Sequence, residues 1–108
     1  MISVALSMLL LAAAPEPPTK RREAYARCLK DFARASLEKK LDPAAFDAAF
    51  AAACRDKEAL FKTSLVSSEV AMGVKRAVAE QGIQEEISIY RSNTQEDYRA
   101  ELASAPKP

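Results

Sequence analysis

The chain has 108 residues, enough for one domain, and its 16 lysines and arginines nearly balance its 15 aspartates and glutamates. The resulting net charge of +1 argues against nucleic acid as the main partner, because such binding rests on a one-sided basic surface. The chain contains no histidine, so it lacks the commonest general acid–base group and the commonest metal ligand.

The N-terminal part of the chain is an uncharged run, residues 2–14, followed by a proline-rich segment, residues 15–19. The run has the length of the apolar part of a secretory signal and is short for a membrane span, which needs about 20 residues. We therefore expect residues 1–14 to be a signal peptide and residues 15–19 to be an exposed arm of an exported protein, in the periplasm or outside the cell. The alternative is an uncleaved N-terminal anchor on a cytoplasmic protein.

The remainder of the chain is dominated by residues that favour helices. Residues 20–102 contain one proline, Pro43, and two glycines, Gly73 and Gly82, among many alanines, leucines, glutamates, lysines and arginines. This composition predicts an all-α fold. We expect a single helical domain over residues 20–102, followed by a disordered tail at 103–108.

The first two helices are expected over residues 20–39 and from Pro43 to about Phe61, with a turn between them at residue 41. The second helix has the clearest start, because Asp42 is an N-cap residue and proline is favoured at the first helical position. Apolar residues recur in both segments at the spacing of one helix face. They are Tyr25, Cys28, Leu29, Phe32 and Leu37 in the first, and Phe46, Phe50, Ala53, Cys54 and Phe61 in the second.

The two cysteines predict a disulfide that joins these helices. Cys28 and Cys54 are each 13 residues from the turn at residue 41, and residues equidistant from the turn of an antiparallel hairpin lie side by side. The same relation places Phe32 opposite Phe50. A disulfide persists in oxidising compartments, which agrees with export. The alternatives are two free buried thiols, or a redox or metal function, which would lack C-x-x-C spacing and a set of four ligands.

One or two further helices are expected after the hairpin. A third should begin between residues 63 and 67 and end at Gly82 as its C-terminal glycine, and a fourth should cover residues 83–102. The third carries a stripe of valines at four-residue spacing, Val66, Val70, Val74 and Val78. The weak break at its start leaves open a continuous second and third helix. We therefore expect an antiparallel helical hairpin stapled by a disulfide, in a domain of three or four helices.

The sequence offers no constellation that predicts catalysis. Its serines have no histidine to activate them, and its two glycines do not form a phosphate-binding loop. Its carboxylates lie in charged segments that contain nothing to raise a pKa. We therefore expect a protein that is not an enzyme and has no cofactor and no metal.

Two surfaces are the candidates for binding. One is the alanine-rich face of the second helix, and the other is a basic cluster at the start of the first. We expect a non-catalytic interaction or accessory module of the cell envelope, which binds an unidentified protein partner or a second copy of itself. The alternatives are contact with an anionic envelope or membrane surface through the basic cluster, and a thiol-redox protein. The residues are Ala45, Ala48 and Ala52 on the alanine face, and Lys20, Arg21, Arg22 and Arg27 in the basic cluster.

The export hypothesis predicts the mass of the native protein. Removal of the signal should leave an N-terminus between Ala13 and Thr19, because the apolar run ends in small residues that signal peptidase accepts. Mass spectrometry of the protein isolated from its own cells measures this directly. An intact Met1 in the cytosolic fraction would contradict export.

Overall fold

The structure is a computed structural model that describes residues 16–105, so the expected signal peptide and residues 106–108 lie outside the described part. The described chain contains four helices and no strand, which confirms the all-α prediction. The helices are α2 (Pro18–Glu38), α3 (Pro43–Phe50), α4 (Arg55–Ala71) and α5 (Arg76–Ser104). The first begins inside the expected proline-rich arm, and the last extends two residues into the expected tail.

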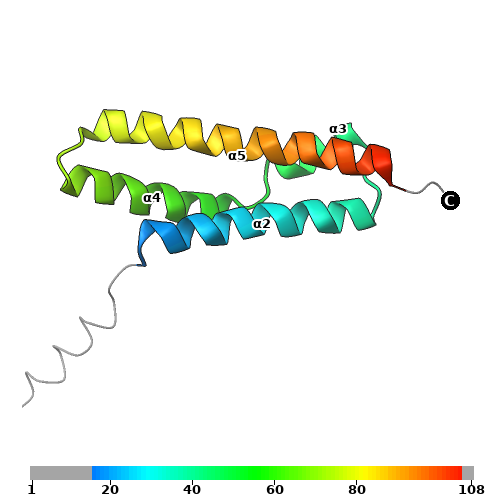
Figure 1. Cartoon of the computed structure of the whole chain (residues 1–108), viewed down its shortest axis with the longest axis horizontal. Helices are drawn as coiled ribbons and strands as arrows, with labels where there is room; N and C mark the ends of the chain where they lie inside the picture. Colours follow the sequence, from blue (N-terminus) through cyan, green and yellow to red (C-terminus); the bar gives the residue numbers. More distant parts are fainter. Residues whose placement is uncertain (1–15, 106–108) are drawn as a thin grey trace, which may run out of the picture.

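The three long helices form an elongated bundle (Figure 1). Helices α2 and α5 run in the same direction, and α4 runs antiparallel to both. Each of the three contacts the other two. The short helix α3 lies near the C-terminal end of α5, where it completes the bundle beyond the start of α4.

The start of α3 agrees with the prediction from the sequence. The side chain of Asp42 accepts a hydrogen bond of 2.8 Å from the backbone nitrogen of Ala45, and Pro43 occupies the first helical position. The capping oxygen satisfies one of the backbone N–H groups that a helix start leaves without a partner.

The predicted end of the second helix is wrong. Helix α3 ends at Phe50, and the chain breaks over residues 51–54 before α4 begins at Arg55. Cys54 has a φ of 62°, in the left-handed region that ends helical propagation. A weak break was expected near residues 63–67, but these residues are continuous helix inside α4. The two segments are therefore separate helices, with the boundary moved towards the N-terminus.

The predicted boundary at Gly82 is also wrong. Helix α4 ends at Ala71, the glycine with a left-handed φ of 97° is Gly73, and α5 continues through Gly82. Glycine adopts such a φ without the steric cost that a Cβ brings. The valine stripe is divided by this turn, and Val78 is 59% exposed.

Aromatic side chains fill the core in two groups. Near α3, the rings of Phe46 and Tyr98 stack with their centroids 3.8 Å apart, and Phe32 lies 6.0 Å from Phe50. The second of these contacts is the one expected from the hairpin. Further along the bundle, Tyr25 packs on Phe61 with centroids 6.0 Å apart. The hydroxyl of Tyr98 donates to the carbonyl of Leu41, which ties the end of α5 to the α2–α3 turn.

The predicted disulfide is present. Cys28 and Cys54 are bonded, and their Cα atoms are 6.0 Å apart, inside the range that a disulfide spans. Cys28 lies in the middle of α2, whereas Cys54 is the N-cap residue of α4 and lies in the break rather than within a helix. The bond therefore fastens α2 to the junction of α3 and α4.

The disulfide should supply a large share of the stability of this small domain. Closing a loop with a sequence separation of 26 stabilises a fold by about 3–4 kcal/mol on the chain-entropy estimate. Cys28→Ser and Cys54→Ser should each lower the free energy of unfolding by that amount, measured by urea denaturation. The double variant should lose no more than either single one, because all three lack the same bond. The reduced wild type is the matched control, and a double variant with twice the loss would contradict this assignment.

Candidate functional site

Two simple classes of site find no support in the described residues. Residues 16–105 bring no three of the side chains histidine, cysteine, aspartate and glutamate together in a group that could hold a metal ion. No helix in the same residues has both the length and the apolar character needed to cross a membrane. Two other features of these residues are a largely buried charged cluster and an open groove between helices.

The charged cluster is centred on Arg91 of α5. Its guanidinium donates to Glu58 Oε1 over 2.7 Å, to the carbonyl of Phe50 over 2.9 Å and to the carbonyl of Ala53 over 2.8 Å. The side chains of Arg91 and Glu58 are each only 13% exposed. The carbonyl of Phe50, at the end of α3, also accepts from the backbone nitrogen of Ala53, and the carbonyl of Ala53 lies in the break after the helix. Arg91 therefore caps α3 from a distant part of the chain.

Glu58 of α4 receives two further donors. The Tyr25 hydroxyl donates to Oε1 over 2.8 Å, and Arg55 Nη1 donates to Oε2 over 2.6 Å. Burial acts to raise the pKa of Glu58, but the hydrogen bonds from Arg91, Arg55 and Tyr25 outweigh it, and the pKa is lowered. Burial, followed by the hydrogen bond to Glu58, raises the pKa of Tyr25.

These shifts keep the carboxylate of Glu58 charged and the phenol of Tyr25 neutral at neutral pH. Catalytic acids and bases instead have a pKa moved towards the working pH. Within residues 16–105, every buried side-chain nitrogen and oxygen has a hydrogen-bond partner. The cluster therefore has the properties of a structural network that holds α3, α4 and α5 together.

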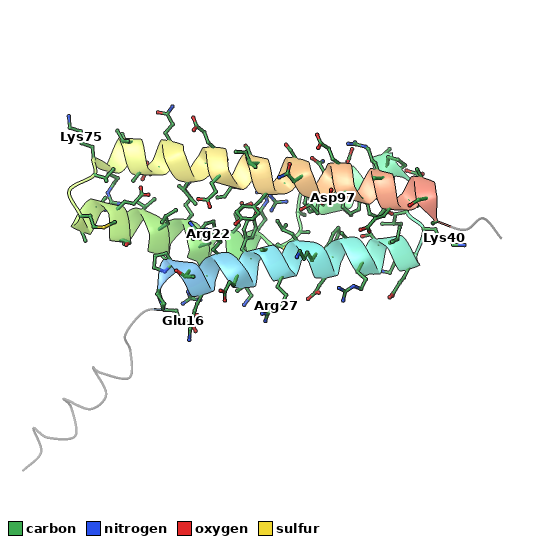
Figure 2. The ribbon with its side chains drawn as sticks, viewed as in Figure 1. Glu16, Arg22, Arg27, Lys40, Lys75 and Asp97 are labelled. Carbon is green, nitrogen blue, oxygen red and sulfur yellow. A yellow bond between two sulfur atoms is a disulfide. The ribbon has the colours of Figure 1, made fainter. Side chains whose placement is uncertain are left out.

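The open groove lies between α2 and α5. Its volume is about 500 Å³. Figure 2 shows these two helices side by side, with Asp97 on α5. The groove is concave because α2 contributes alanines where larger side chains would fill it. Its floor consists of Ala26, Leu29, Ala33 and Leu37 from α2, and of Tyr90 and Tyr98 from α5.

The two rims of the groove carry opposite charges. Helix α2 supplies Lys30 and Arg34, and α5 supplies Asp97 and Glu101, all of them exposed. Among the ion pairs of residues 16–105, none joins one rim to the other. The ion pair of Arg34 is with Asp31 of its own helix, over 3.9 Å. The groove thus presents a cationic edge and an anionic edge that do not neutralise each other through direct contact.

The alanines predicted as an interaction face lie elsewhere. Ala45 and Ala48 are exposed on α3, and Ala52 is exposed in the break that follows it. They do not line the groove, and the end of α3 at Phe50 divides them, so they are not one continuous helix face. Their role in binding stays a prediction.

The predicted basic cluster is partly engaged within the chain. Arg22 donates to Glu86 of α5 over 3.0 Å, and its guanidinium lies 5.1 Å from the ring centroid of Phe61. Arg21 approaches Glu16 to 3.9 Å. Lys20 and Arg27 are exposed. The cluster is therefore less available to an anionic surface than its sequence indicates.

The sequence contains a signal for the groove that composition alone did not reveal. The lining residues of α2 include positions 26, 30, 33 and 37, and those of α5 include positions 90, 94, 97 and 101, with the same spacing of four, three and four residues. Such spacing marks one face of a helix. Both faces carry charges, so they resemble solvated surfaces until the helices are placed side by side.

Comparison of the chain with protein-family models, curated proteins and solved structures finds no match. Inference about function therefore depends on the chain's own residues. Among the features described, the groove is a concave surface with an apolar floor, of the kind that receives ligands or helices.

The structural role of Arg91 can be tested by substitution. Arg91→Met should reduce the free energy of unfolding by about 3 kcal/mol, because it leaves the Glu58 carboxylate largely buried without its main partner. Arg99→Met is the matched control, since its ion pair with Asp47 is more exposed and should contribute less than about 1 kcal/mol. Urea denaturation at neutral pH measures both.

The effect of Arg91 should also depend on pH. The pKa of Glu58 is lower in the folded protein than its ordinary value of 4.5, so this stabilisation is complete above that pH and is lost as pH falls through the folded pKa. The difference between wild type and Arg91→Met should therefore shrink in acid. A difference that stays constant down to low pH, or equal losses for Arg91→Met and Arg99→Met, would contradict the network.

Proposed function

We propose that the protein is a non-catalytic interaction module of the cell envelope, which binds a helical surface of another polypeptide in the α2–α5 groove. The observation that carries the proposal is the groove, with its apolar floor between rims of opposite charge.

The dimensions of the groove support a helical ligand. The lining residues extend from Ala26 to Leu37 on α2, which corresponds to about 16 Å, or three helical turns. A helix that binds in a groove uses anchors at positions i, i+3 or i+4, and i+7, which cover a similar length. The alanines of the floor leave room for such anchors to approach the helix backbone.

The disulfide supports action outside the cytoplasm. The bond between Cys28 and Cys54 needs an oxidising compartment to form and persist. The uncharged run at residues 2–14 has the composition of a secretory signal. We therefore place the module in the periplasm or in the extracellular space.

The other functions raised by the sequence have less support. Binding to an anionic surface would draw on the basic cluster, of which Arg22 already pairs with Glu86. A thiol-redox function would draw on Cys28 and Cys54, which lack C-x-x-C spacing and join two separate elements of the fold.

Site-specific photo-crosslinking can test the groove in the native cell. A photoreactive phenylalanine analogue in place of Ala33, in the groove floor, should give an adduct with a polypeptide of defined mass. The same analogue in place of Ala48, exposed on α3, is the matched control and should give none. Protease digestion and mass spectrometry of the adduct identify the crosslinked peptide.

The experiment also separates the two predicted faces. An adduct from position 48 alone would move the interaction to the alanine face of α3 and contradict the groove. The lack of an adduct from both positions would contradict a polypeptide ligand altogether.

A further inference from the structure

We infer that the ligand of the groove is a second copy of this chain, in a twofold-symmetric dimer in which α2 of each copy lies on α5 of the other. The inference rests on the proposed function, since it names the polypeptide that the groove binds. Three observations lead to it: the distribution of charge between the rims, the register of α2 against α5, and the small side chains of the floor.

The charges that would complement each rim are present on the other rim. Lys30 and Arg34 form the edge contributed by α2, and Asp97 and Glu101 form the edge contributed by α5. The lining residues of α2 include no acidic side chain, and those of α5 include no basic one. An occupant of the groove needs negative charge against α2 and positive charge against α5, and a second copy supplies both.

The register of the two helices places these charges at the same level along the helix direction. Arg22 pairs with Glu86, which lies 64 residues later, and the lining residues of the two helices are offset by the same 64 residues. The helices run in the same direction, so a residue of α2 is level with the residue 64 positions later in α5. Arg34 is therefore level with Tyr98, between Asp97 and Glu101.

Symmetry then selects one arrangement. One possible twofold axis is parallel to the helices and passes along the mouth of the groove. Rotation about it leaves the position of every residue along the helix direction unchanged, and brings α2 of one copy over α5 of the other. Lys30 and Arg34 then face Asp97 and Glu101 of the second copy, and symmetry repeats the contact. An axis across the helices would instead bring each helix against its own copy, so that like charges meet.

The floor permits the close approach that this dimer requires. Ala26 and Ala33 have no side chain beyond Cβ, so the aliphatic stems of Lys30 and Arg34 from the other copy can cover them. Leu37 and Tyr90 are half-buried in the single chain and would lose their remaining contact with water. Three turns of two helices form a small interface, so we expect a dissociation constant of the dimer in the micromolar range.

Charge reversal and sedimentation analysis test the inference. The wild-type protein at about 100 μM and low salt should sediment as a dimer. Lys30→Glu with Arg34→Glu should be monomeric, as should Asp97→Lys with Glu101→Lys, because each pair of substitutions places like charges across the interface. The variant that combines all four substitutions should regain the dimer, since the charges are exchanged and complementary again.

All four residues are exposed, so the variants should keep their helical circular dichroism. Ala77→Glu, which adds a charge at an exposed position of α5 outside the groove, is the matched control and should leave the dimer unchanged. A monomeric wild type would overturn the second-copy inference, as would paired variants that still dimerise or a fourfold variant that does not.

The sedimentation test of the dimer and the crosslinking test of the groove can fail independently of each other. A monomeric wild type together with an adduct from position 33 to a different protein would leave the groove as a binding site and remove only the second copy. An adduct with twice the mass of the chain supports both proposals. No adduct and no dimer would reject both.

Discussion

The guanidinium of Arg91 is the group on which the arrangement of the helices depends. It reaches from α5 to the carbonyl of Phe50 at the end of α3, to the carbonyl of Ala53 in the break that follows, and to the carboxylate of Glu58 on α4. A helix that ends inside a small bundle must find partners for its last carbonyls, and here Arg91 adds a side-chain donor to the backbone bond that Ala53 makes to Phe50. The break is thereby held in place, and with it the position of Cys54 opposite Cys28.

The disulfide could be predicted although the second helix is not continuous. From Pro43 to Phe50 the chain is helical and antiparallel to α2, so the distance from the turn to the break is nearly that of an unbroken helix. The break itself was not predictable from local preferences. It falls among alanines, the strongest helix formers, because contacts with a distant arginine outweigh a propensity of a few tenths of a kcal/mol per residue. Gly82 is the opposite case. The helix continues past this glycine because burial of Ala79 and Ile83 outweighs the low helix propensity of glycine.

The groove could not have been located from the sequence for a different reason. Composition directed attention to the alanines around Ala48, whereas the groove is formed by Ala26 and Ala33, which are separated by charged residues. Their effect appears only when α2 and α5 lie in parallel with a fixed offset, a relation set by contacts such as that between Arg22 and Glu86. A pair of faces that is unremarkable on each helix becomes one concave surface in the fold.

The structural network and the groove are linked through α4. This helix contacts both α2 and α5, and it is fastened to α2 through the adjacent Cys28–Cys54 disulfide and to α5 through Glu58 and Arg91. The separation of the two rims is therefore determined before any ligand binds. A binding surface that is already in its bound shape avoids the entropic cost of ordering side chains and helices on association. In the proposed complex the buried charges and the disulfide would thus contribute to recognition indirectly, by keeping the cationic and anionic edges of the groove at a constant distance and register.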